Sequence, residues 1–104
     1  MKTTLSKVTV IAERLLKDQL LTLIRDKGAT GYTLTLVEGE GSRGVRASDW
    51  EGRNIKIETI VSAEVADQIF DALADEYFND FAVIAWLDEV KVLRGNKFAS
   101  GSGK

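Results

Sequence analysis

The chain has 104 residues, of which 44% are hydrophobic and 29% are charged, and it contains neither cysteine nor histidine. This length and balance predict one globular domain. The missing residue types exclude disulfides, thiol nucleophiles, imidazole acid–base catalysis and Cys/His zinc sites. A net charge of −2 offers no overall positive field for nucleic acid or anionic lipid. With no long apolar run or signal-peptide pattern, we expect a soluble, intracellular protein.

The first 28 residues predict a strand followed by a helix. Hydrophobic residues alternate at period two over residues 8–12, which is typical of a strand. From Arg14 the period changes to that of a helix. Gly28 is placed to end this helix as its left-handed cap. The predicted buried stripe consists of Leu15, Leu16, Leu20, Leu23 and Ile24.

The rest of the chain predicts three more strands and a second helix. The strands are residues 32–37, residues 55–61 and residues 81–87, and residues 90–93 could continue the last one. Ser62 is a suitable N-cap for the helix. Its predicted buried stripe is Val65, Ala66, Ile69, Phe70, Leu73, Ala74 and Tyr77, and we also expect Phe78 in the core.

The element order is strand, helix, strand, strand, helix, strand. This order predicts a ferredoxin-like α+β fold, an antiparallel sheet with two helices on one face. The other face should then be polar, but the last strand is apolar on both sides, with Ile84 and Trp86 opposite Val83, Ala85 and Leu87. Because large exposed apolar patches mark interfaces, we expect another copy of the chain to cover this face.

A loop over residues 38–53 is the only segment with a chemical signature. It contains four of the nine glycines and little apolar periodicity. Backbone amides, a hydroxyl and two guanidinium groups lie close together there, and this combination suits phosphate. The residues concerned are Gly39, Gly41, Ser42, Arg43 and Arg46. The alternative interpretation is a solvated loop whose arginines pair with its own acids.

Two further features allow more than one interpretation. Lys91, Arg94 and Lys97 form a small basic cluster that is either scattered surface charge or a second wall of an anion site. Trp50, in the loop, either folds back on the body or serves as an anchor for a partner.

At several of these residues the chain resembles the PII-like signalling proteins. The similar segments are residues 31–33, 41–46, 54–58 and 77–80, and the resemblance extends to Phe98. The nearest groups are the SbtB regulators of the bicarbonate transporter SbtA and the carboxysome-associated PII-like proteins. Many SbtB relatives end in a paired-cysteine tail, which this chain lacks, so the redox behaviour of that tail is not carried over.

The resemblance implies a homotrimer that binds AMP, ADP, ATP or cyclic AMP between subunits, with Ca²⁺ or Mg²⁺ as possible companions of ATP. Residues 38–53 would be the family's T-loop within a domain of residues 1–98, followed by a disordered tail of residues 99–104. In the loop, Gly39, Gly41 and Ser42 would contact the nucleotide, and Arg43 and Arg46 would neutralise its phosphate. In the last strand, Val83 would contact the adenine. Lys91 and Arg94 would reach the phosphates from a neighbouring subunit.

The function that the resemblance implies is non-enzymatic: the T-loop would regulate bicarbonate uptake at the cytoplasmic face of an SbtA-type transporter. The protein would then be cytoplasmic and recruited to the inner face of the plasma membrane. The alternatives are a carboxysome-associated adenylate and bicarbonate sensor, an RNA-binding ferredoxin-like domain, and a small phosphohydrolase. The acidic composition disfavours RNA, and no general base or metal cluster is evident for hydrolysis.

Overall fold

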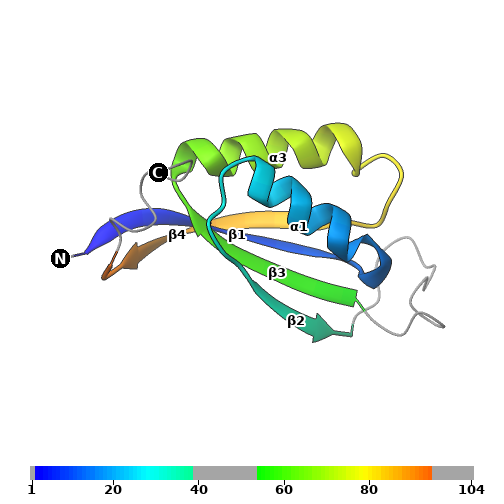
Figure 1. Ribbon diagram of the computed structural model, residues 1–104, viewed down its shortest axis with the longest axis horizontal. Coiled ribbons are helices and arrows are strands. Elements are labelled where there is room, and N and C mark those ends of the chain that lie inside the picture. The colour runs from blue at the N-terminus through cyan, green and yellow to red at the C-terminus, as the bar shows by residue number, and fades with distance from the viewer. Residues whose placement is uncertain (1, 39–53, 95–104) are drawn as a thin grey trace.

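A computed structural model of the protein describes residues 2–38 and 54–94. The elements are β1 (Thr3–Glu13), the 3₁₀ turn η1 (Arg14–Leu16), α1 (Lys17–Asp26), β2 (Thr33–Val37), β3 (Asn54–Val61), α3 (Ala63–Glu76) and β4 (Ile84–Val92). The strands form one antiparallel sheet in the order β2-β3-β1-β4. Figure 1 shows α1 and α3 together on one face of this sheet. The predicted ferredoxin-like fold is confirmed.

The core lies between the two helices and the central strands β1 and β3. Val8, Val10 and Ala12 alternate along β1, and each faces a buried residue of β3 in the register of the sheet. This is the period-two pattern that the sequence shows. The largest fully buried side chains are Val8, Val10, Leu16, Leu20, Ile24, Ile55, Ile57, Val61, Ile69 and Leu73, together with Thr9 on the other face.

The first helix begins differently from the prediction. A 3₁₀ turn precedes α1, and no side chain caps either of them at the N-terminus. Because the 3₁₀ turn has fewer residues per turn than an α-helix, it changes which side chains face the core. Leu15 is therefore 52% exposed, whereas Leu21 is buried. The expectation of a buried Leu15 was therefore wrong. Gly28 has a φ of 121°, which confirms its predicted role as the left-handed cap.

The second helix follows its sequence signals closely. The backbone amide of Val65 donates to the Ser62 hydroxyl at 3.2 Å, which confirms the N-cap. Most of the predicted stripe is buried, although Ala74 is exposed and Ala72 is buried, since Ala72 lies three residues after Ile69 on the inner face. Phe78 is 41% exposed because it follows the end of the helix, so its predicted place in the core was wrong.

The edge strand β4 leaves apolar side chains on the face opposite the helices. Ile84 and Trp86 pair with Ile11 and Thr9, which alternate with the core-facing residues of β1. Ile84 is 59% exposed and Trp86 40% exposed, so the predicted apolar open face is present. Leu87 belongs to the helix side but is 38% exposed, because β4 lies at the edge of the sheet.

Candidate functional site

The predicted loop starts and ends at one end of the sheet. Val37, the last residue of β2, pairs with Asn54, the first residue of β3, and Asn54 pairs with Glu13 at the end of β1. Of the predicted phosphate ligands, Gly39, Gly41, Ser42, Arg43 and Arg46 lie outside the described residues, as does Trp50. The structure therefore places the attachment points of the loop and leaves the roles of these residues as predictions.

Val83, the predicted adenine contact, lies at the same end of the sheet. It precedes Ile84, which pairs with Ile11 near the end of β1. The Val83 amide donates to the Phe81 carbonyl at 3.0 Å, and the half-buried Val83 side chain packs against the core. Three strand spacings separate Val83 from the end of β2, about 14 Å across the sheet. A ligand of nucleotide size could therefore reach from one to the other only as an extended molecule.

The basic residues Lys91 and Arg94 lie at the opposite end of the same strand. Lys91 pairs with Thr4, and its Nζ donates to Thr4 Oγ1 at 3.3 Å. Arg94 is exposed in the turn that follows β4. The extended strand from Ile84 to Lys91 spans on the order of 20 Å. Within one copy of the chain, Val83 and the basic pair therefore lie at opposite ends of the sheet.

The open face of the sheet carries an ion pair among its apolar residues. Lys7 Nζ lies 3.4 Å from Glu58 Oε2, and the two side chains are about one-third exposed. Thr9, between Glu58 and Trp86 in the register, is 2% exposed even though no helix covers it. This face is therefore partly packed within one chain, and the ion pair was not predicted from the sequence.

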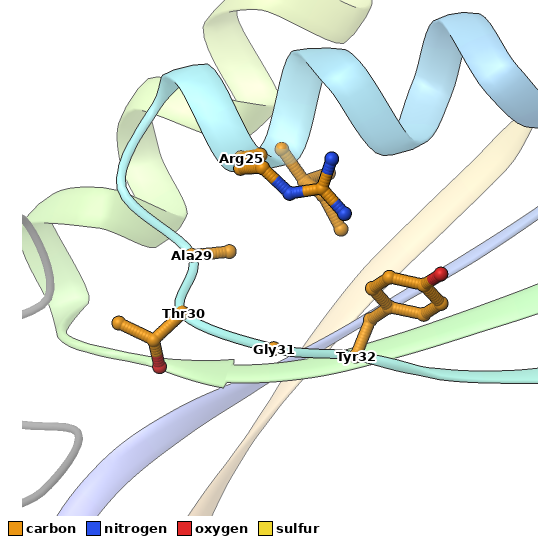
Figure 2. A pocket seen from close by; sticks show the side chains of 6 residues that line it. Arg25, Ala29, Thr30, Gly31 and Tyr32 are labelled. Atoms are coloured by element: carbon orange, nitrogen blue, oxygen red, sulfur yellow. The ribbon is translucent and has the colours of Figure 1, made fainter.

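The structure also contains a pocket that sequence reasoning missed. It has a volume of about 270 Å³ and lies where α1 turns into β2. Arg25 from the helix and Tyr32 before the strand point into the same space, as Figure 2 shows. The sequence analysis placed Tyr32 at the start of the predicted strand of residues 32–37, and Gly31 in a segment similar to the PII-like signalling proteins. The signal that could have indicated a pocket is a glycine and a large aromatic residue next to each other between two elements.

Tyr77 joins the two helices near the loop end of the sheet. Its hydroxyl donates to Gln19 Oε1 at 3.1 Å, and its ring lies 5.7 Å from that of Phe81. Burial, and to a lesser extent the carboxylate of Glu76, raises the pKa of the Tyr77 hydroxyl above its ordinary value. Tyr77 is a core residue, as predicted, and holds α3 against α1.

Two features are absent from the part of the chain that the structure describes. Residues 2–38 and 54–94 contain no group of three or more acidic residues arranged to hold a metal ion. Within the same residues, neither helix has the length and hydropathy needed to cross a membrane.

Known proteins that are similar to this chain point to one family. The family described as nitrogen regulatory protein P-II matches residues 5–97. A Thermus thermophilus protein assigned to the PII-like signalling proteins is 50% identical, with a TM-score of 0.82, over 93% of this chain and 97% of the other.

Two more distant structures share the fold. CPII of Thiomonas intermedia K12, bound to ADP, AMP and acetate, is 23% identical with a TM-score of 0.83, over 95% of this chain and 98% of CPII. GlnK of B. subtilis, in complex with ATP, is 18% identical with a TM-score of 0.62, over 84% of this chain and 82% of GlnK. From the match to almost the whole chain, we conclude that this protein belongs to the P-II family of signalling proteins.

Proposed function

We propose that the protein is a trimeric sensor that binds adenine nucleotides in the clefts between its subunits. The observation that carries this proposal is the separation of the predicted ligands. Val83 and the attachment points of the loop lie at one end of the sheet, whereas Lys91 and Arg94 lie at the other. A site that uses both groups requires two copies of the chain. The relatives CPII, crystallised with ADP and AMP, and GlnK, crystallised with ATP, support an adenine nucleotide as the ligand.

The exposed apolar face supports the oligomer that this site needs. Ile84 and Trp86 lie on the side of the sheet that the helices do not cover. Covering them with other copies of the chain removes apolar surface from water. A closed ring of three copies would bring the basic end of one β4 near the loop end of the next. We propose this arrangement as the origin of the complete site.

Nucleotide binding would then select the shape of residues 38–53. Arg43 and Arg46 would form charge-assisted hydrogen bonds with the phosphate, and Gly39, Gly41 and Ser42 would supply amides and a hydroxyl. A ligand that binds one loop conformation better than another shifts the population toward it. Because nucleotides differ in the phosphates they offer, they would present different loop shapes to a partner.

The decisive measurement is calorimetry with AMP on the Arg43→Ala/Arg46→Ala double variant. Each lost charge-assisted bond is worth about 1.5–3 kcal/mol, so AMP affinity should fall at least about 100-fold. Light scattering should show an unchanged oligomer. The control variant Lys17→Ala/Lys27→Ala removes the same charge from α1 and its C-terminal end and should bind AMP normally. Unchanged affinity of the arginine variant would refute the phosphate role.

We further propose that the loop regulates bicarbonate uptake at the cytoplasmic face of an SbtA-type transporter, with Trp50 as an anchor. The measurement is co-sedimentation with vesicles that contain such a transporter, in the presence of each nucleotide. Retention should depend on the nucleotide and should be lost in Trp50→Ala. Nucleotide-independent retention, or none, would contradict this partner.

A carboxysome-associated adenylate and bicarbonate sensor is a second candidate. A specific observation favours it: CPII, 22% identical to this chain, was crystallised with ADP, AMP and bicarbonate. Calorimetry of AMP and ADP with and without bicarbonate separates the two candidates. A nucleotide affinity that rises with bicarbonate favours the second, and an unchanged affinity favours the first.

A further inference from the structure

The pocket between α1 and β2 has both an apolar and a cationic wall. The Tyr32 ring provides apolar surface, and the Arg25 guanidinium extends into the same space, as seen in Figure 2. Tyr32 is 44% exposed, so its ring is available to a molecule from solvent. An aromatic face next to a guanidinium suits a flat ring that carries one anionic group.

The charge of Arg25 is free to act on such a ligand. Among residues 2–38 and 54–94 the ion pair recorded is that of Lys7 with Glu58, and Arg25 has no carboxylate partner there. The pocket also adjoins the C-terminal end of α1, whose carbonyls would repel an anion. The amides of Lys27, Gly28 and Ala29 donate to three of these carbonyls, which reduces that repulsion.

Gly31 lies on the pocket wall, and neither its backbone angles nor its neighbours in residues 2–38 and 54–94 require a glycine. Among the described residues only Gly28 has a positive φ, so the backbone of Gly31 does not require glycine. A Cβ atom built on Gly31 would meet nothing within 4 Å. Glycine costs about 0.5–1 kcal/mol relative to alanine through the entropy of the unfolded chain. Close approach of another molecule is one physical reason for a glycine at such a position.

The position of Gly31 is nevertheless held firmly. Its carbonyl accepts a hydrogen bond of 2.6 Å from Thr59 Oγ1 on β3, and the Thr59 side chain is buried. On the other side, the turn that ends α1 is closed by the hydrogen bonds of Gly28 and Ala29. The pocket wall is therefore preformed and needs little ordering to accept a ligand.

We propose that this pocket binds a small aromatic carboxylate, with the ring on Tyr32 and the carboxylate on Arg25. None of the residues that line the pocket is among the predicted nucleotide ligands, so this inference does not depend on the proposed nucleotide site. Each protomer would hold one such ligand.

The test is a two-dimensional amide NMR titration of the 104-residue protein with sodium benzoate, carried out without AMP and again with AMP at a saturating concentration. We expect saturable shifts concentrated on residues 24–33, with a dissociation constant on the order of millimolar because the pocket is small. Neutral benzyl alcohol and the non-aromatic cyclohexanecarboxylate should each bind at least about tenfold more weakly, since each lacks one of the two contacts.

Three variants identify the contacts. Arg25→Gln should weaken benzoate binding at least about tenfold, and Lys27→Gln, which removes a nearby charge that does not line the pocket, should leave it unchanged. Gly31→Ala should also weaken binding about tenfold because the new methyl group occupies the pocket, while its melting temperature should not fall.

Several results would overturn the proposal. One is the absence of saturable shifts, and another is an equal loss of affinity in Arg25→Gln and Lys27→Gln, which indicates a general charge effect. Displacement of benzoate by AMP would make the pocket part of the nucleotide site. Benzoate binding in a protein that does not bind AMP would uphold this inference and refute the proposed function, so the two can fail separately.

Discussion

The substitution Ile84→Glu tests the role of the apolar open face. Ile84 is 59% exposed in the single chain. Burying a whole isoleucine side chain is worth about 1.5–3 kcal/mol, so covering the remaining surface is worth about 1–2 kcal/mol per protomer. In the proposed trimer, three protomers together lose about 3–6 kcal/mol, which raises the dissociation constant by about two to four orders of magnitude. A carboxylate buried in the interface adds several kcal/mol more.

The assay is sedimentation equilibrium, with circular dichroism to follow the fold. We expect Ile84→Glu to sediment as a folded monomer, because a charge at an exposed position does not disturb the single chain. The control is Leu15→Glu, which places the same charge at a residue that is 52% exposed on the helix side and should leave the trimer intact. A trimer with unchanged dissociation in Ile84→Glu, or a monomeric wild type, would refute the reasoning.

Three further predictions concern single hydrogen bonds, each measured by urea unfolding. Ser62→Ala removes the N-cap bond and should lower the free energy of unfolding by about 1 kcal/mol, whereas Ser62→Asp should retain it. Thr59→Val leaves the Gly31 carbonyl without its buried partner and should cost about 1–3 kcal/mol; a neutral effect would mean that water replaces the hydroxyl. Tyr77→Phe removes the bond to Gln19, and its destabilisation should shrink as the pH rises above 10.0, the ordinary pKa of tyrosine. The pKa of Tyr77 is higher in the folded than in the unfolded chain, so its contribution to stability is complete below the unfolded pKa and is lost as the pH rises through the folded pKa. If the difference in unfolding free energy between wild type and Tyr77→Phe does not change with pH, this prediction is contradicted.

Local patterns predicted most of the fold because each depends on near neighbours in the sequence. Alternation in residues 55–61, the Ser62 cap and the Gly28 cap all appear where they were expected. The errors occur where packing decides between adjacent positions. Leu15 and Phe78 lie next to helix ends, where the turn geometry rotates a side chain away from the core.

The candidate site was predictable only in part. The residue types of the loop indicate phosphate chemistry, and the resemblance implies a site between subunits; both stay predictions because residues 39–53 lie outside the described part of the chain. The spacing of Val83 and Lys91 in the sequence predicts that an extended strand holds them far apart. Which end of the sheet each one occupies follows only from the register of β4 against β1. The pocket at Arg25 and Tyr32 lies between the end of α1 and the start of β2. Neither hydrophobic periodicity nor a sequence motif predicts that these two side chains line the same space.

The amino-acid sequence alone determined the order of the elements, the apolar stripes and the chemistry available, because these follow from backbone sterics and from which side chains prefer water. It also shows that these 104 residues contain neither cysteine nor histidine. The tertiary structure decided which side chains share a space, namely the Lys7–Glu58 ion pair, the Tyr77–Gln19 bond and the pocket beside Gly31. These contacts depend on strand register and helix placement, which the whole core sets at once and no single segment contains.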